Sequence, residues 1–303
     1  METMGKRYMR KYWQLYLLMV LPVLYFIIFK YLPMFGNILA FRSFHPGASP
    51  FGIEWVGLKY FKIFLADAAF WRAFQNTFLL AVLNLLVNFP IPIIFSLLLN
   101  ELASVKFKKV LQTVSYMPRF LSTVVVVSML TEILSPSSGV VNYLLKILLN
   151  IDPIYFANEP EYFRPLYILS DTWQFTGWNA VIYLAAIAGI NEELYEASII
   201  DGANRWQQTR YVTLPSIMST IMVMFILRVG QLMSLGFEKV LLLYTPQNSV
   251  VSDIIDTFVY RIGLVQANYS YATAVGLFGG IIGVVLVTFA NKASKGLTGQ
   301  SLY

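Results

Sequence analysis

The chain offers few residues that could carry out a reaction. It contains no Cys, and His45 is its one His, which excludes disulfides, thiolate metal sites and cysteine nucleophiles and leaves too few ligands for zinc. Glu132 and Asp171 lie near the outer ends of apolar runs, but neither has a His or Cys nearby in sequence to complete a catalytic pair. No G-x-x-x-x-G-K-[ST] run exists, so we do not expect the chain itself to bind ATP phosphates.

Polar side chains inside long apolar runs are better candidates for function. Such residues are costly in lipid, so they usually face a water-filled path, a neighbouring helix or a partner subunit. Asn84 and Asn88 are four residues apart and share a helix face, where helix packing and pathway lining remain equal alternatives. Arg228 lies in the middle of an apolar run, and we expect it to face a pathway or a subunit interface. Gln231 and Ser234 are expected to share approximately the same helix face.

Aromatic and amide side chains open another apolar run. Trp173, Trp178 and Asn179 have the chemistry that sugars favour, because rings stack on pyranose faces and amides bond hydroxyl groups. Tryptophan at a membrane interface also serves as an anchor, and this alternative stays open.

The elements that position these residues are membrane spans. The 303 residues are 57% hydrophobic and 13% charged, and the mean hydropathy is +0.63, which is typical of a polytopic membrane protein. The net charge of +6 does not indicate nucleic-acid binding, because Lys and Arg lie at the ends of apolar runs. The sequence predicts an all-α fold with six spans of about 20 residues, at 15–35, 74–98, 110–134, 166–190, 215–236 and 272–291.

Clusters of Lys and Arg predict the orientation of the spans, because positive residues are held on the cytoplasmic side. The first span is too long for a cleaved signal peptide, and we expect a permanent anchor. Both termini and the loops at 101–109 and 191–213 are predicted to be cytoplasmic. The clusters are Lys6, Arg7, Arg10 and Lys11; Lys106, Lys108 and Lys109; Arg205 and Arg210; and Lys292 and Lys295.

The cytoplasmic stretch "EASIIDGANRWQQTRYVTLP" at 196–215 is a polar segment between two apolar runs. Asn191 can cap a helix that Gly202 ends by supplying a left-handed residue. Leu194, Ala197 and Ile200 are spaced by three and share one face. Such a projecting helix suits a groove on a soluble partner, and from periodicity alone an interfacial helix on the lipid surface is an equal alternative.

The spacing favours the docking helix. Glu196, Ala197 and Ser198 are followed after three residues by Gly202 and after nine more by Val212, with Leu214 and Pro215 closing the pattern. This resembles the E-A-A-x3-G-x9-I-x-L-P signature of permease subunits of binding-protein-dependent ABC importers. Ser198 and Val212 depart from the signature conservatively. The resemblance continues at 70–82, where "FWRAFQNTFLLAV" is similar to the entry of the family's core transmembrane domain. Two stretches resemble the family's carbohydrate branch, "GVVNYLL" at 139–145 and "DTWQFTGWNAVIYLAAIAGINEELYEASIIDGA" at 171–203. "GFEKVLLLYTP" at 236–246 and "SDIIDTFVYRIGL" at 252–264 are similar to permeases for oligosaccharides derived from complex polysaccharides.

The resemblance implies the type I importer fold, with an N-terminal segment, first span and external loop at 1–71, a transmembrane core at 72–291 and a cytoplasmic tail at 292–303. It implies a multi-pass protein of a prokaryotic cytoplasmic (inner) membrane, working with a second, related permease, two ATP-binding subunits and an extracytoplasmic solute-binding protein. ATP and Mg are expected on the ATPase subunits, with no cofactor or metal on this chain. The coupling residues implied by the resemblance are Glu196, Ala197, Ser198, Asp201, Gly202, Ala203, Leu214 and Pro215.

The expected function is import of an oligosaccharide, and Arg228 leaves open an acidic, uronate-bearing one because its guanidinium can bind a carboxylate. The candidate pathway residues are Asn88, Trp178, Asn179, Arg228, Gln231 and Ser234. The alternatives are an ion-coupled secondary transporter and, less favoured, a polytopic membrane enzyme. Pro90 and Pro92 do interrupt the second span, as in such transporters, but no matching broken helix occurs in the other half. Gly276, Gly279, Gly280 and Gly283 predict close helix packing in the last span. The turn-rich loop at 42–55 is predicted to lie outside, where it either faces the solute-binding protein or only connects two helices.

Overall fold

The computed structural model describes residues 11–47, 49 and 51–298, which are mostly helical. The predicted N-terminal cluster of Lys6, Arg7 and Arg10 and the end of the tail at 299–303 lie outside the described residues. The chain divides into two units, 1–67 with 259–278 and 68–258 with 279–303.

The first unit is built around a long apolar helix. Helical turns run without a gap through α2 (Trp13–Phe26), the π-helix η1 (Ile27–Tyr31), α3 (Leu32–Met34) and the 3-10 helix η2 (Phe35–Phe41). The short strands β1 (Arg42–Ser43) and β2 (Glu54–Trp55) then pair antiparallel, and α4 (Lys59–Leu65) follows. Phe41 stacks on both Trp55 and Phe61, which fastens this hairpin to its neighbours. The later part of the chain adds the π-helix η5 (Arg261–Val265) to this unit.

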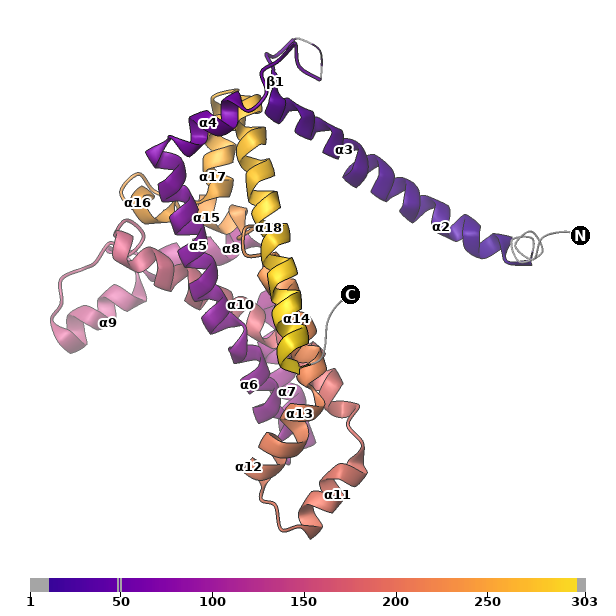
Figure 1. The fold of residues 1–303 in the computed structure, drawn as a ribbon. Coiled ribbons are helices and arrows are strands. Elements are labelled where there is room, and N and C mark those ends of the chain that lie inside the picture. Colours follow the sequence, from indigo (N-terminus) through magenta and orange to yellow (C-terminus); the bar gives the residue numbers. More distant parts are fainter. Residues whose placement is uncertain (1–10, 48, 50, 299–303) are drawn as a thin grey trace, which may run out of the picture. The chain divides into compact units, whose positions relative to one another are not determined.

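The second unit contains the remaining helices (Figure 1). They are α5 (Ala68–Asn88), α6 (Pro90–Asn100), α7 (Val105–Tyr116), η3 (Met117–Phe120), α8 (Thr123–Ile133), α9 (Val140–Leu149), α10 (Pro160–Ala188), α11 (Glu192–Ile200), α12 (Arg205–Gln208), η4 (Thr209–Thr213), α13 (Leu214–Ser216), α14 (Met218–Gly230), α15 (Phe237–Leu243) and α16 (Ser249–Ser252). Two helices belong to both units, α17 (Ile255–Tyr260) and α18 (Tyr269–Thr298).

Two of the predicted spans are bent instead of straight. The third divides into Val105–Phe120 and Thr123–Ile133, which meet at 99°. The reason is local: Pro118 cannot donate a backbone hydrogen bond, and Ser122 starts a new helix by accepting from the backbone N–H of Val125 at 3.3 Å. The fifth predicted span, 215–236, begins at a bend of 61° between Arg205–Ser216 and Met218–Gly230, just after Pro215. The spans predicted at 110–134 and 215–236 thus each belong to a bent helix pair, which counts as one span when its two parts are taken together.

By length and composition, three helical stretches of the described chain can cross a membrane, and five can if each bent pair counts as one. The three are Trp13–Phe41, Ala68–Asn100 and Tyr269–Gly296. Helix α10 has 29 residues, more than the roughly 20 that a crossing needs, but it contains many polar residues. Of these polar residues, Asp171 and Asn179 line the cavities of the candidate site.

Helix α10 is the central element of the second unit. Its Tyr167 and Ile168 pack with Leu80 of α5 and Val240 of α15 in one buried cluster. Nearer its other end, Tyr183 and Ile187 pack with Ile93, Ile217 and Ile221 in a second cluster. At Gly177 an added Cβ would clash with the backbone of Ser115 in α7, so this glycine permits the close approach of α7 to α10.

The glycines of the last span do not show the close packing that their spacing predicts. An added Cβ at Gly276, Gly279 or Gly280 would meet nothing within 4 Å in the described chain. Only Gly283 approaches another backbone, with the carbonyl oxygen of Gly230 at 3.8 Å from the added atom. The prediction therefore fails for this glycine face within the single chain.

Candidate functional site

The loop between α10 and α14 folds as a pair of short, exposed helical pieces (Figure 1). Asn191 caps α11 by accepting from the backbone N–H of Glu193 at 3.1 Å, and Glu192 and Glu193 occupy the first turn, where anions are favoured. Gly202 has a φ of +77°, the left-handed conformation that glycine adopts without strain. The predicted cap and glycine break are both present.

A second cap starts the return toward the core. Asn204 and Gln207 form a capping box at the start of α12, with mutual bonds of 2.8 and 3.0 Å. Tyr195 of α11 shares a 2.8 Å hydrogen bond with Thr213 of η4, which holds the two pieces together. Arg205 forms a 3.1 Å ion pair with Glu101, just after α6. The loop is thus bonded to the end of the helix that continues α5.

The residues that the signature selected fall into two groups. Glu196, Ala197, Asp201 and Pro215 are exposed, whereas Ser198, Ala203 and Leu214 are partly buried. On the face predicted from spacing, Leu194 and Ile200 expose 49% and 85% of their surface and Ala197 is also exposed, which leaves this apolar face of α11 free for a partner. Ile199, on another side of α11, is 62% exposed. We refer to residues 192–208 as the coupling segment.

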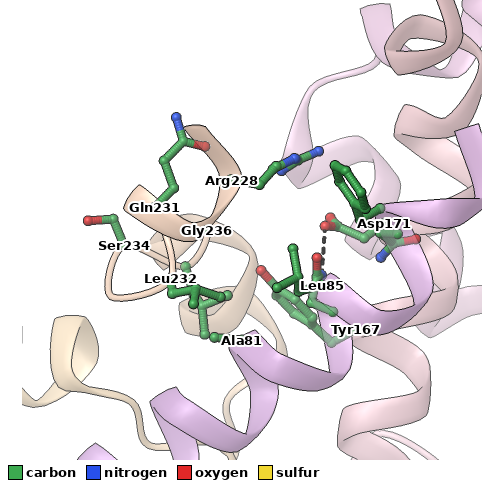
Figure 2. Close-up of a pocket in the computed structure, with 13 residues that line it drawn as sticks. Ala81, Leu85, Tyr167, Asp171, Arg228, Gln231, Leu232, Ser234 and Gly236 are labelled. Atoms are coloured by element: carbon green, nitrogen blue, oxygen red, sulfur yellow. Dashed lines mark hydrogen bonds between the residues drawn. The ribbon is translucent and has the colours of Figure 1, made fainter. Parts of the chain in front are cut away.

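Away from the coupling segment, a small polar cavity of about 90 Å³ lies between α5, α10 and the turn after α14 (Figure 2). Arg228, Gln231 and Ser234 come from one side and Tyr167 and Asp171 from the other (Figure 2). Asn84 and Asn88 complete its polar lining.

Asp171, which lines this cavity, belongs to a largely buried ion pair. Asp171 accepts hydrogen bonds from the ammonium group of Lys239 at 2.8 Å and from the amide of Asn84 at 3.0 Å (Figure 2 draws the latter). The Lys239 ammonium also lies 5.8 and 5.5 Å from the ring centroids of Tyr167 and Phe175, within reach of a cation–π interaction. The Asp171 carboxylate is therefore neutralised by a cation of its own.

Arg228 has no such partner: none of the ion pairs or hydrogen bonds found among the described residues involves its guanidinium group. It lines the small cavity and also a second, open one of about 330 Å³. The larger volume falls in the range of about 300–1,000 Å³ typical of small-molecule sites. The residues that line it are Arg119, Phe175, Trp178, Asn179, Met224, Leu227, Arg228 and Gln231.

The structure brings the six predicted pathway residues to these two cavities, which share Arg228 and Gln231. Asn88 and Ser234 line only the small cavity, and Trp178 and Asn179 line only the larger one. The shared helix face predicted for Gln231 and Ser234 is wrong, because α14 ends at Gly230 and both residues belong to the turn that follows. Both residues nevertheless line the small cavity.

Three charged residues in or beside the cavities were not identified as pathway residues from the sequence: Asp171 and Arg119 each line a cavity, and Lys239 pairs with Asp171 but lines neither. Asp171 was considered only as a catalytic carboxylate, and Lys239 stands between two apolar runs as one more loop cation. Arg119 lies within the third predicted span, so the rule that singled out Arg228 would have found it as well.

Comparisons with known proteins identify the class of molecule that carries this arrangement. Residues 93–295 match the family described as "Binding-protein-dependent transport system inner membrane component". The chain is 43% identical over 289 residues to Protein LplB of Bacillus subtilis, covering 95% of this chain and 91% of that one. It is 44% identical over 287 residues to the polygalacturonan/rhamnogalacturonan transport system permease protein YteP of the same organism, covering 94% and 89%.

A solved structure agrees with these sequence matches. A chain of a bacterial ABC transporter involved in the import of the acidic polysaccharide alginate superposes with a TM-score of 0.89 and 40% identity, covering 98% of this chain and 100% of that one. A second structure shows such a transporter in complex with a periplasmic protein bound to an alginate pentasaccharide, with a TM-score of 0.89 and 39% identity, covering 98% and 99%.

Proposed function

The chain belongs to the family of binding-protein-dependent transport system inner membrane components, as a multi-pass permease subunit of a sugar ABC importer, and on this premise we propose that its solute is an acidic oligosaccharide. The predicted importer function is confirmed, and family membership removes the secondary transporter and the membrane enzyme as alternatives. What remains to be assigned is the chemistry of the solute and the working of the subunit.

One observation supports the proposal of an acidic solute: the positive and negative charges around the cavities do not balance. Asp171 is paired with Lys239 at 2.8 Å, and Arg228 is left without a carboxylate among the described residues. An unpaired guanidinium group inside a membrane-spanning helix costs free energy unless water or an anion reaches it. A uronate carboxylate supplies that anion, because its two oxygens match the two parallel donors of an arginine. The names of the two similar importers, for polygalacturonan/rhamnogalacturonan and for alginate, support the same proposal.

Neutral parts of the sugar have partners in the same wall. The indole of Trp178 presents a ring on which a pyranose face can stack, and the amides of Asn179 and Gln231 can bond hydroxyl groups. In this arrangement the arginine selects the acid while the ring and the amides hold the backbone of the oligosaccharide.

The coupling segment is assigned to the ATPase subunit. Its exposed apolar face on α11 and its exposed Glu196 fit a groove of a soluble partner. The Glu101–Arg205 ion pair and the Tyr195–Thr213 hydrogen bond provide a route from this face to α6 and α14. Closure of the ATPase subunits would then shift the permease from outward to inward access. ATP and Mg are proposed to bind on those subunits, and a second permease and an extracytoplasmic solute-binding protein complete the assembly.

We further propose that both termini and the coupling segment are cytoplasmic. The ion pair between Glu101 and Arg205 supports this orientation, because it places the loop at 101–109 and the coupling segment at the same end of the second unit. Both segments carry the clustered Lys and Arg that are typical of cytoplasmic loops.

The test is a comparison of two solutes in one reconstituted importer. The permease is co-purified with its companion permease, ATPase subunits and solute-binding protein, and placed in liposomes. Uptake of a short oligouronate is measured against its methyl ester, which keeps the backbone and removes the charge. We expect the acid to be transported at least about tenfold better, as the loss of a charge-assisted hydrogen bond predicts. Equal uptake of the two forms would refute an acidic solute.

A further inference from the structure

A second arginine faces the larger cavity from the other bent span. Arg119 belongs to η3, the turn at which the third span bends, directly after the buried Pro118. Together with Arg228 it lines the cavity of about 330 Å³. Like Arg228, it takes part in none of the ion pairs of the described residues. The cavity thus has two guanidinium groups and no carboxylate in its lining.

An aromatic ring holds Arg119 in place. Its guanidinium carbon lies 5.2 Å from the centroid of Phe175, a distance at which cation–π attraction operates. The same ring has the Lys239 ammonium at 5.5 Å, and that ammonium is already paired with Asp171. Phe175 therefore contacts one neutralised cation and one unpaired cation, and only the unpaired one, Arg119, lines the larger cavity.

The position of Phe175 is itself fixed by the fold. It precedes Gly177 by two residues on α10, where the backbone of α7 comes too close for any side chain at Gly177. Its other neighbour, Gln174, is buried and donates a 3.1 Å hydrogen bond to the carbonyl of Leu121, just after η3. The bend that carries Arg119 is thus bonded to the helix that carries the ring, which keeps the exposed Arg119 beside Phe175 at the open cavity.

We propose that Arg119 is a specificity-determining residue that binds a second carboxylate of the solute, and that Phe175 is its positioning residue. The solute class that follows is an oligosaccharide with at least two ionised carboxylates, one for Arg228 and one for Arg119. This inference rests on the proposed acidic solute. It adds that the permease binds two ionised sugar units of that solute.

The experiment compares Arg119→Gln with Arg228→Gln in the complete reconstituted importer. Each is supplied with two oligouronates of equal length, one fully ionised and one methyl-esterified at all but one unit. For the parent we expect the fully ionised sugar to have a KM about tenfold lower or better, within the range of a charge-assisted hydrogen bond. Arg119→Gln should abolish this preference, whereas Arg228→Gln should weaken uptake of both sugars.

Three further variants separate binding from structure. Arg119→Lys keeps the charge but loses the fork of donors, and should retain part of the preference. Phe175→Leu should reduce the preference as Arg119→Gln does, and Phe175→Trp, which restores a ring for the guanidinium, should recover it. The matched control is Lys146→Gln, which removes an exposed cation paired with Asp152 outside the cavities and should change neither KM.

The outcomes are distinguishable. If the parent prefers oligouronates to methyl esters but Arg119→Gln keeps the parental preference for the fully ionised sugar, the role of Arg119 is refuted and the acidic solute stands. If the parent shows no preference for any acid, both fail together. If Arg119→Gln and Arg119→Lys both lose the companion subunits, Arg119 is an assembly contact and the inference is wrong.

Discussion

Lys239 donates a 2.8 Å hydrogen bond to Asp171, and the two side chains expose only 5% and 19% of their surface. A buried pair of this kind gains Coulomb energy but loses the hydration of both charges, so its presence alone does not imply stability. Its consequence is electrostatic: it removes the one acidic charge from the wall of the cavities and leaves the positive charge of Arg228 available to a solute.

The first prediction concerns this pair. Lys239→Met leaves the Asp171 carboxylate buried without a cation, and we expect it to lower the stability of the assembled importer by about 3–5 kcal/mol. Lys239→Met combined with Asp171→Asn should recover most of this loss, because the amide needs no counter-ion. The check is the thermal unfolding midpoint of the purified complex. A double variant that is less stable than the lysine variant alone would show that the two charges do not act as a pair.

The second prediction concerns the glycine break of the coupling segment. Gly202→Ala forces a side chain into a φ of +77°, at a cost of about 1–2 kcal/mol, although no atom lies within 4 Å to clash with it. We expect the segment to change shape and solute-stimulated ATPase activity to fall severalfold while the subunits still assemble. Gly189→Ala is the matched control, since that glycine has an ordinary φ of −89° and only loose contacts. Equal activity in both variants would contradict the role of the glycine.

The third prediction tests the orientation. The chain contains no Cys, so a single introduced thiol can be labelled without a background. Glu192→Cys, in the exposed first turn of α11, should be protected from an impermeant thiol reagent added outside intact cells. Asp152→Cys, where the native side chain is 92% exposed, should be labelled under the same conditions. The reverse pattern would invert the proposed topology.

The fourth prediction is a pH dependence. Burial raises the pKa of Asp256 in α17 to about 6, above the value of about 3.9 for an unfolded Asp. The folded chain therefore binds this proton more tightly than the unfolded chain, and stability falls as the pH rises from about 4 to about 6. Asp256→Asn removes the penalty, so the variant should unfold at a higher temperature than the parent above pH 6 and at the same temperature near pH 4.

Asp152 is the control for this titration, because its pKa shift has the opposite sign. The hydrogen bond from Lys146, and then the positive charge of Lys146, lower the pKa of the Asp152 carboxyl group. Asp152→Asn should therefore never stabilise the chain at neutral pH, and because the pair is exposed its effect should be small. A gain in stability for Asp152→Asn equal to that of Asp256→Asn would indicate a general effect of net charge instead of the burial of one carboxyl group.

The coupling segment was predictable from sequence because its geometry is local. An Asn cap, acidic residues in the first turn and a glycine break are each determined by neighbouring residues, and all three occur as expected. The spacing of Asn84 and Asn88 likewise predicted that they share a helix face, and both line the small cavity.

The parts of the site that were missed depend on contacts distant in sequence. The bend at Pro118 turns Arg119 toward Phe175, some 56 positions further along, and the pairing of Asp171 with Lys239 joins α10 to α15. Hydropathy identifies an apolar run as one span whether the helix is straight or bent by 99°. The positions of the polar residues beyond the bend therefore could not be predicted from hydropathy.

The last prediction separates a sugar contact from a membrane anchor on a single helix. Trp173 and Trp178 are both on α10 and expose 50% and 48% of their surface, but they are five residues apart and so point in directions about 140° apart. Only Trp178 lines the larger cavity. If its ring stacks on the solute, Trp178→Ala should reduce uptake severalfold at limiting oligosaccharide, since an aromatic contact contributes about 0.5–1.5 kcal/mol beyond its buried area. Trp173→Ala should transport normally. An equal loss in both variants, accompanied by poorer membrane assembly, would instead identify Trp178 as an anchor.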